Sequence, residues 1–461
     1  MNHLTTITLL GKNNRKTQLT PIRMAVHSPC TIMEATSQTG ELYHAYFFRQ
    51  QFLAAKKVTR SRLGSYLELA MTKGIVFLCP HPVVTHLLQG KNQLKNKSLT
   101  DLHSSIKNRY SPLEVSQIFR CFDSLIQKDK LFKVMRECYY DYRRDGKWGK
   151  AYSVLVTLEE AFPTHEWIAH TKHDASFSSY HDKYDTLDSS LLTTDPTTMD
   201  WLLWKHRYEP QNLTTWIDSF SLKSAHSLAA FSLLYEQQLT SSTSTSIHQF
   251  LDTAKHLFTQ KELKDILLQM THSPNSVIHQ EAFRQCIRLR AWEDALTTFI
   301  QHPFLLEDQD LHSLKEAIAH VKWNEHLPID QLSRALIPIL KEEKHHLDTI
   351  LTACVPILSQ THDLNYLMEW LKPLDEAKCT LPIYQRVQKL ALYAEDPNKQ
   401  FLAGELYYQL GLKNEAIDSF IYEMEMNPND PSPVKWLQTL YQETGQLDEA
   451  AAYQQLLKSL C

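Results

Sequence analysis

The N-terminal residues alternate between apolar and polar positions in the way of a half-buried strand. Ile22, Met24 and Val26 are apolar, whereas the side chains between them are charged or small. This period of two is typical of β-strands. Residues 37–40 predict a turn, and a second apolar stretch follows at 41–47. The start of the chain is therefore predicted to contain a small β-sheet.

The spacing then changes to that of a helix between residues 48 and 71, with a break near Thr59. The apolar positions that share one face are Leu63, Tyr66, Leu67 and Ala70. Spacings of three, one and three residues place them on one side of a helix. The short apolar run at 75–78 fits either a strand or the start of a helix, because periodicity does not separate the two.

Helical patterns dominate from residue 111 onward. Ser111, Pro112 and Glu114 form a helix start in which serine caps, proline fits the first turn and glutamate completes a capping box. Residues 173–198 are rich in Ser, Asp and Thr and predict a linker or long loop. The predicted organisation is a basic α+β region at 1–110, a helical region with one hairpin at 111–172, this linker at 173–198, and a helical array at 199–461.

An internal repeat of 34 residues is the most informative feature of the sequence. In the window 397–430, small residues allow two helices to approach, a glycine ends the first helix, and a proline ends the second. These positions are Gly404, Tyr407, Gly411, Ala416, Phe420 and Pro428. The next window repeats three of them as Tyr441, Gly445 and Ala450. A further copy lies upstream at 132–165, with Tyr142, Gly146, Ala151 and Pro163.

This pattern resembles the tetratricopeptide repeat family. A weaker copy lies at 283–299, where Arg290 and Ala291 stand in the turn and the glycine is lost. The resemblance implies a mainly α fold: an α-solenoid of helical hairpins, here with a small N-terminal α+β region. It also implies a scaffold for protein–protein interaction. The last repeat lacks the family's usual capping helix, so self-association through this uncapped C-terminal repeat is a second expectation.

Composition and motifs favour binding over catalysis. Only 10 of the 461 residues are glycine, and they form no phosphate-cradling loop and no nucleophile elbow. His165 and His170 are five residues apart, so their rings diverge on a helix, and a metal site is not expected. We therefore expect no enzyme activity, no cofactor and no metal. With no apolar run that could span a membrane and no signal pattern, the sequence predicts a cytoplasmic protein whose eight cysteines are buried thiols.

Charge divides the chain into two unlike parts. Residues 1–150 contain 24 Lys+Arg and 10 Asp+Glu, whereas the remainder contains 24 and 42. A basic cluster gives a candidate anion-binding site at Lys56, Lys57, Arg60 and Arg62. Phe47, Phe48 and Phe52 could stack bases beside it, or they could form a core with the cations as its solvated rim. The leading interpretation is a scaffold for a protein or peptide. The alternative is a nucleic-acid-binding regulator whose repeat array senses or recruits a partner.

Overall fold

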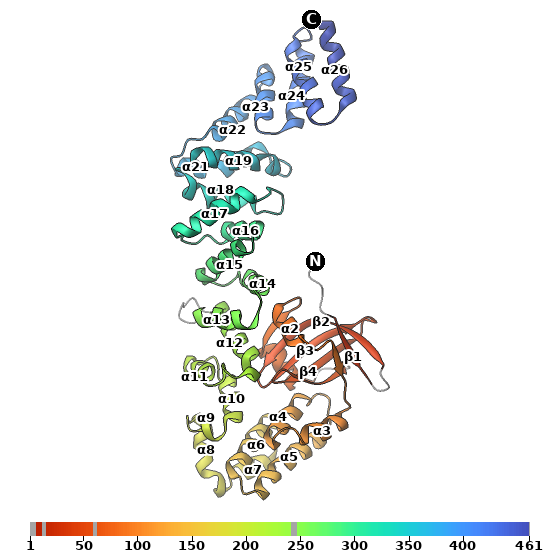
Figure 1. Ribbon diagram of the computed structural model, residues 1–461, viewed down its shortest axis with the longest axis vertical. Helices are drawn as coiled ribbons and strands as arrows, with labels where there is room; N and C mark the ends of the chain where they lie inside the picture. The colour runs from red at the N-terminus through yellow and green to blue at the C-terminus, as the bar shows by residue number, and fades with distance from the viewer. Residues whose placement is uncertain (1–5, 12–14, 59–61, 241–246, 461) are drawn as a thin grey trace. The chain divides into compact units, whose positions relative to one another are not determined.

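The computed structural model describes residues 6–11, 15–58, 62–240 and 247–460, and it divides into two compact units (Figure 1). The first unit spans Met1–Ile278 and the second His279–Cys461. The first joins a β-sheet to helices, and the described elements of the second are all helices. The fold is therefore mainly α, with an N-terminal α+β region.

A seven-stranded sheet forms the start of the first unit. Its strands are β1 (Ile7–Leu10), β2 (Lys16–His27), β3 (Cys30–Ser37), β4 (Leu42–Phe48), β5 (Gln51–Lys57), β6 (Ile75–Leu78) and β7 (Gln93–Lys95). The strand order is β5-β4-β3-β2-β1-β7, and β6 pairs with β2 outside this path. All neighbours are antiparallel except β1 and β7, which run parallel. The run at 75–78, which fitted either a strand or a helix by sequence, is thus a strand.

The two edges of this sheet approach each other, so that the sheet curls into a partly open barrel. The side chain of Asn96, just after β7, accepts a hydrogen bond from the backbone N–H of Ala55 in β5 at 3.0 Å. Beside it, the Lys56 ammonium donates to the carbonyl of Lys97 at 2.7 Å. These bonds occupy polar groups on edges that would otherwise be open to another strand.

One prediction for this region is wrong: residues 51–57 form strand β5 and not part of a helix. Ala54 and Ala55 favour helices locally, but they pair with β4, where Ala55 lies opposite Ala45 and Ala54 opposite Tyr46. Burial against the sheet outweighs local preference. The helix begins only at α1 (Tyr66–Lys73), which Ser65 caps.

The helices of the first unit follow the sheet. They are α2 (Pro82–Leu88), α3 (Leu99–Lys107), α4 (Pro112–Cys121), α5 (Lys128–Arg144), α6 (Trp148–Ala161), α7 (Glu166–Lys172), α8 (Ser178–Asp185), α9 (Leu191–Thr194), α10 (Pro196–Lys205), α11 (Pro210–Phe220), α12 (Ser227–Thr240), α13 (Ile247–Leu257) and α14 (Gln260–Gln269), with 3-10 turns at Ala175–Phe177 and Ser224–His226. The predicted capping box of Ser111 and Glu114 is present at the start of α4.

The prediction of a linker at 173–198 is also wrong, because the segment is folded onto α6. It contains α8, α9 and the start of α10. The buried carboxylate of Asp195 accepts hydrogen bonds from the Tyr184 hydroxyl at 2.7 Å and from the Ser153 hydroxyl of α6. Phe177 is fully buried. A segment rich in polar residues is ordered here because its polar groups are paired inside the protein.

The end of the sheet that carries the 28–29 and 49–50 turns is attached to helices by side-chain contacts and by a disulfide. Arg49 pairs with Glu114 of α4 at 2.6 Å, and Gln50 donates to the carbonyl of Ser224 at 3.0 Å. Ser28 donates to the buried carboxylate of Asp200, which also accepts from Trp216 Nε1 at 2.8 Å and pairs with His226 Nε2 at 2.9 Å.

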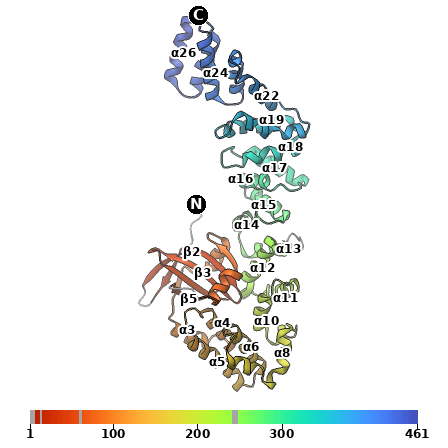
Figure 2. The ribbon, with the colours of Figure 1, turned by 180° about the vertical axis from the view of Figure 1, so that it is seen from behind.

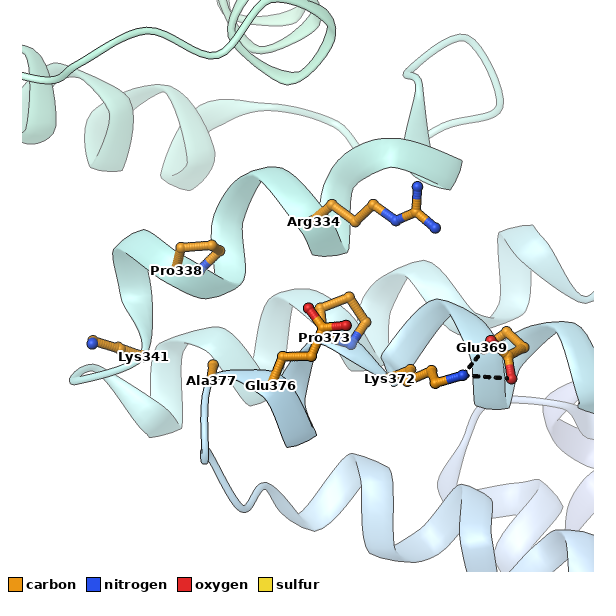
Figure 3. Close-up of a pocket in the computed structure, with 8 residues that line it drawn as sticks. All are labelled: Arg334, Pro338, Lys341, Glu369, Lys372, Pro373, Glu376 and Ala377. Atoms are coloured by element: carbon orange, nitrogen blue, oxygen red, sulfur yellow. Dashed lines mark hydrogen bonds and ion pairs between the residues drawn. The ribbon is translucent and has the colours of Figure 1, made fainter.

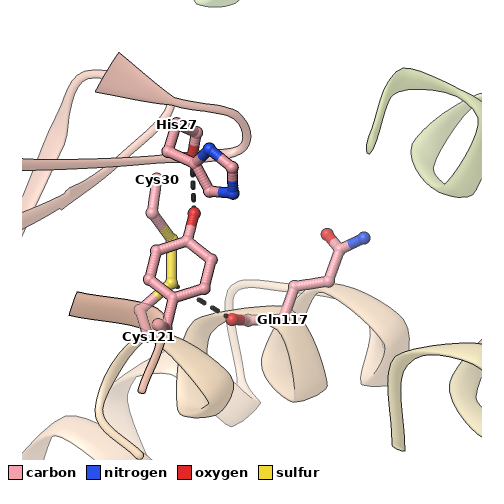
Figure 4. The surroundings of a disulfide bond; sticks show 5 residues. His27, Cys30, Gln117 and Cys121 are labelled. Atoms are coloured by element: carbon pink, nitrogen blue, oxygen red, sulfur yellow. Dashed lines mark hydrogen bonds between the residues drawn. A yellow bond between two sulfur atoms is a disulfide. The ribbon is translucent and has the colours of Figure 1, made fainter. Parts of the chain in front are cut away.

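A disulfide between Cys30 of β3 and Cys121 of α4 adds a covalent attachment (Figure 4). The expectation that the cysteines are all thiols is therefore wrong for this pair. The two residues are 91 apart in sequence, and no pattern of spacing marks them. They meet because the folded sheet places β3 against α4.

The second unit consists of successive antiparallel helices. They are most of α15 (Ser276–Arg288), then α16 (Trp292–Gln301), α17 (Asp308–His320), α18 (Ile329–Leu340), α19 (Lys344–Leu358), α20 (Leu364–Leu371), α21 (Pro373–Glu376), α22 (Pro382–Tyr393), α23 (Gln400–Gln409), α24 (Lys413–Met426), α25 (Pro431–Glu443) and α26 (Leu447–Leu460). The last two hairpins, α23–α24 and α25–α26, break near Gly411, Pro428 and Gly445, as the repeat predicts.

Three glycines of the repeat occupy equivalent backbone positions. Gly146, Gly411 and Gly445 have φ of 71°, 78° and 80°, in the left-handed region that glycine adopts without strain. In each case the next residue donates a backbone hydrogen bond of 2.9 Å to the residue five positions before it, as Leu412 does to Tyr407. This is a Schellman motif, which satisfies the last carbonyls of the first helix.

The weaker copy at 283–299 makes the same turn without glycine. Arg290 takes a φ of 55°, and Ala291 donates to the carbonyl of Cys286 at 2.9 Å. The exposed Arg290 thus stands where the other copies have glycine. The copy at 283–299 therefore keeps the backbone geometry of the repeat, although it lacks the glycine of the sequence pattern.

The small and apolar positions of the repeats lie in their cores. Ala151, Ala416, Ala450 and Phe420 are buried, and Gly404 packs under the ring of Phe420. Pro163 and Pro428 each lie two residues after the last residue of a second helix, α6 and α24 respectively. Tyr407 and Tyr441 are half-buried, and Tyr407 packs against the cluster formed by Ala416 and Phe420.

Candidate functional site

Helix α18 forms one wall of a groove within the second unit. Its buried side packs Leu332, Leu336 and Leu340 into the core, while Arg334 and Pro338 face solvent. Leucines at spacings of four produce this division into a buried and an exposed side. Pro338 has no N–H to donate to the carbonyl of Arg334, so the helix lacks one backbone hydrogen bond on its exposed side.

Helices α20 and α21 form the opposite wall, and two hydrogen bonds from α20 hold this wall to α18. Trp370 Nε1 donates to the carbonyl of Ile329 at 2.9 Å, and the Tyr366 hydroxyl donates to Asp330 at 2.7 Å. Burial and the bond to Asp330 raise the pKa of Tyr366 to about 12, so the hydroxyl stays protonated as a donor. At the other end, the Cys379 thiol contacts the carbonyl of Lys341 at 3.7 Å.

The groove between these walls has a volume of about 710 Å³ (Figure 3). Its lining residues are Arg334, Pro338, Lys341, Glu369, Lys372, Pro373, Glu376 and Ala377. This volume lies within the range of about 300–1,000 Å³ that is usual for ligand sites in proteins. The two prolines supply apolar surface, and the charged side chains surround it.

The charges of the groove differ from those of the unit around it. Residues 279–461 contain 16 Lys+Arg and 27 Asp+Glu, which gives a net charge of −11. In the groove, Lys372 pairs with Glu369 at 3.2 Å. Arg334 and Lys341 have no carboxylate within ion-pair distance in the described part of the chain. The groove therefore holds two exposed cations in a unit of net negative charge, with Glu376 as the remaining acidic group of the lining.

The candidate anion-binding cations are not gathered into one site by the structure. Lys57 forms an ion pair with Glu41 at 2.6 Å, and Lys56 is bonded to the carbonyl of Lys97. Arg62 lies 3.6 Å from the carboxylate of Asp123. Arg60 lies outside the described residues. Each of the three described cations therefore has its own partner.

The aromatic residues beside this cluster are part of the core. Phe47 and Phe48 are fully buried, and Phe47 meets Phe52 edge to face at 5.6 Å between ring centroids. Phe48 packs in the same way on Tyr110. Buried rings are not accessible to nucleic-acid bases, so the core interpretation of these residues is favoured.

The histidines near residue 170 are engaged in ring contacts. His165 stacks on Phe132 at 4.0 Å, and His173 stacks on His181, which pairs with Asp185 at 2.8 Å. Across the described residues, no group of three or more His, Cys, Asp or Glu side chains is arranged to hold a metal ion.

The groove residues were not singled out by sequence reasoning. Arg334 lies in α18, Lys341 directly follows that helix, and Lys372 lies between α20 and α21; no motif links the three residues. One available signal was Pro338 inside an otherwise regular helical pattern, because an interior proline marks a site where the backbone departs from the standard bond ladder.

The fold defines a class: a mainly α protein of helical hairpins with a curled N-terminal β-sheet. None of its described helices has the length and apolar character needed to cross a membrane. No protein-family model matches the chain, and no curated protein matches it.

One match among solved structures is a chain from "Structure of Naa15/Naa10 bound to HypK-THB", with 14% sequence identity and a TM-score of 0.19. The match covers 82% of this chain and 62% of that chain. A likeness at this TM-score adds nothing to the description of the fold or the site.

Proposed function

We propose that this chain is a tetratricopeptide-type interaction scaffold that binds an acidic peptide segment of a protein partner in the groove between α18 and α20–α21. The observation that carries the proposal is the pair of exposed cations, Arg334 and Lys341, in a groove of an acidic unit. Opposite charges across an interface favour the right partner and disfavour others. No catalytic residue is proposed, and the absence of enzyme activity remains a prediction.

The groove suits a peptide more than a small metabolite. Pro338 and Pro373 offer apolar surface on both walls, and Arg334 can hold a carboxylate through two parallel hydrogen bonds. The carbonyl of Arg334, which Pro338 leaves without its usual donor, could accept a backbone N–H from an extended peptide. Together these groups provide side-chain and main-chain recognition.

The first test measures fluorescence anisotropy with labelled peptides of equal length and equal apolar content. Their charged positions are glutamate in one, glutamine in the second and lysine in the third. We expect the glutamate peptide to bind the full-length chain, and the double variant Arg334→Glu/Lys341→Glu to weaken its binding by about tenfold or more. The control variant Lys389→Glu/Lys435→Glu changes the same charge outside the groove. Equal binding of the three peptides would contradict the proposal.

The second test locates the partner in cells. A photo-cross-linking amino acid replaces Ala377, which lines the groove, or the exposed Lys389, which does not. We expect a partner cross-linked at 377 and not at 389, and its loss when Arg334→Glu/Lys341→Glu is added. Cross-linking at both positions, or cross-linking at 377 that the double variant leaves unchanged, would argue against the groove.

The alternative of a nucleic-acid-binding regulator has less support. Lys56, Lys57 and Arg62 are each engaged within the chain, and Phe47 and Phe48 are buried. Specific binding needs base-reading or stacking groups on the surface. The cytoplasmic location and self-association through α26 likewise remain predictions.

A further inference from the structure

A second pocket lies at the open end of the barrel in the first unit. Its volume is about 520 Å³. The lining residues are Leu9, Gly11, Arg15, Lys16, Thr17, Gln18, Ser37, Gln38, Thr39, Glu41, Tyr43, Lys57 and Asn96. They come from the ends of β1, β3, β5 and β7 and from the starts of β2 and β4. All of these strand termini lie at the same end of the sheet, so the pocket is the mouth of the barrel.

The two ends of the barrel have different surroundings. Residues at the opposite end are bonded to helices through Ser28, Arg49, Gln50 and the Cys30–Cys121 disulfide. In Figure 2, β2, β3 and β5 extend to the side away from α10–α12. The mouths of β-barrels are common places for ligands, because strand ends there bring side chains together around a cavity.

The mouth carries a positive charge that its own residues do not cancel. Glu41 pairs with Lys57 at 2.6 Å, which lowers the pKa of the carboxyl group and raises the pKa of the ammonium, so both are ionised. Arg15 and Lys16 are exposed, and neither has a carboxylate within ion-pair distance in the described ranges. The lining of the mouth therefore contains three cations, Arg15, Lys16 and Lys57, and one carboxylate, that of Glu41.

Neutral hydrogen-bonding groups complete the lining. The Ser37 and Thr39 hydroxyls lie 2.9 Å apart, and the Tyr43 hydroxyl donates to Glu41 at 3.2 Å. Buried Leu9 provides an apolar part of the lining. Guanidinium and ammonium groups bind phosphoryl oxygens well, and hydroxyls and amides can bind the remainder of a polar molecule.

We propose that the mouth of the barrel is a binding site for a small phosphorylated molecule, with Arg15 and Lys16 as the phosphate-binding groups. The pocket is larger than a single phosphate ion requires and lies in the size range of small-molecule sites. This site is in the first unit and is independent of the proposed peptide groove. It also differs from the sequence-predicted cluster, with which it shares only Lys57.

The test is isothermal titration of the full-length chain with inorganic pyrophosphate and with a ribonucleoside 5′-diphosphate. We expect both to bind, the nucleotide more tightly, and the variant Arg15→Glu/Lys16→Glu to lose at least about tenfold in affinity for each. The control Lys130→Glu/Lys133→Glu makes the same charge change at exposed positions of α5, away from the mouth. It should bind as the unaltered chain does.

Circular dichroism of each variant shows whether the fold is kept, and Lys16→Gln provides a milder second variant with an intermediate affinity. Absence of binding to both probes, or equal losses in the mouth variant and the α5 control, would overturn the proposal. Preference for single-stranded RNA over the nucleotide, with loss in the mouth variant, would also overturn it and would assign the mouth to nucleic acid.

Discussion

Gly404 lies directly against the ring of Phe420. A Cβ atom on Gly404 would lie 2.8 Å from both Cε1 and Cζ of that ring, closer than van der Waals contact allows. The ring cannot withdraw easily, because it also stacks on Trp436 at 5.4 Å between centroids and packs edge to face with Phe401. The absence of a side chain at 404 therefore sets how closely α23 approaches α24.

The first prediction concerns this contact. Gly404→Ala gains helix propensity of about 0.5–1 kcal/mol and loses about 1–3 kcal/mol by overpacking, so we expect a net loss of roughly 1 kcal/mol in unfolding free energy. Chemical denaturation measures it. In a Phe420→Leu background the ring is absent, and the same substitution should be neutral or stabilising. A similar loss in both backgrounds would contradict the proposed clash.

The second prediction tests the packing of α24. Ala416 is fully buried in the cluster with Phe420 and Leu437. Ala416→Leu adds three heavy atoms to a filled space and should cost roughly 1–3 kcal/mol of unfolding free energy. Asp418→Leu, at an exposed position of the same helix, is the control and should change stability by no more than about 0.5 kcal/mol.

The third prediction concerns the left-handed turns. At Gly445, no described atom lies within 4 Å of the point where a Cβ atom would stand, so Gly445→Ala is strained by its φ of 80° alone and should cost about 1 kcal/mol. Arg290 holds φ 55° with a side chain. Arg290→Gly should therefore stabilise the second unit. Thermal unfolding of the two variants should shift in opposite directions.

The fourth prediction concerns pH. Burial, with Arg120 and Arg207 nearby, lowers the pKa of His27 to about 3, below its value of 6.5 in an unfolded chain. Below pH 6.5 the unfolded state binds a proton that the folded state does not. The contribution of His27 to the unfolding free energy is therefore fully present above pH 6.5. It falls by up to about 1.4 kcal/mol per pH unit as the pH drops towards 3.

The variant His27→Gln should flatten this dependence, and His248→Gln, at an exposed position of the same unit, should leave it as it was. The test compares the unfolding free energies of the unaltered chain and the two variants between pH 4 and 7. His81, whose pKa burial lowers to about 4, contributes a slope of the same sign in both variants. An unchanged slope in His27→Gln would mean that His27 is not the group responsible.

The helical hairpins could be predicted because their signals are local. Tyr407, Gly411 and Ala416 lie within ten residues, and each acts on its own backbone or on the adjacent helix. Strand β5 could not be predicted from local signals, because Ala54 and Ala55 adopt strand conformation only through pairing with β4. The copy at Arg290 was weak in sequence because a left-handed turn can be held by the hydrogen bonds of its neighbours without glycine.

The two proposed binding sites were harder to predict than the fold. Arg15, Ser37 and Asn96 reach one pocket from three separate strand ends, and their meeting depends on how the whole sheet curls. Arg334 and Lys341 are conspicuous only because the structure places both in the lining of one groove. Asp195 lies in the segment predicted as a linker or long loop, but the fold buries it and Asp200 among donors that are distant in sequence.

The turn between β4 and β5 has residues that attach it to neighbouring helices but that are not the most stable choice for the turn itself. Its two central residues, Arg49 and Gln50, have φ of 44° and 66°, where Asn-Gly would be the relaxed choice. Both side chains are used elsewhere, on Glu114 and on Ser224. A sequence optimised for this hairpin in isolation would thus detach it from its neighbours. In directed evolution of this protein, changes at 49–50 that improve an isolated hairpin should be selected against in the whole chain.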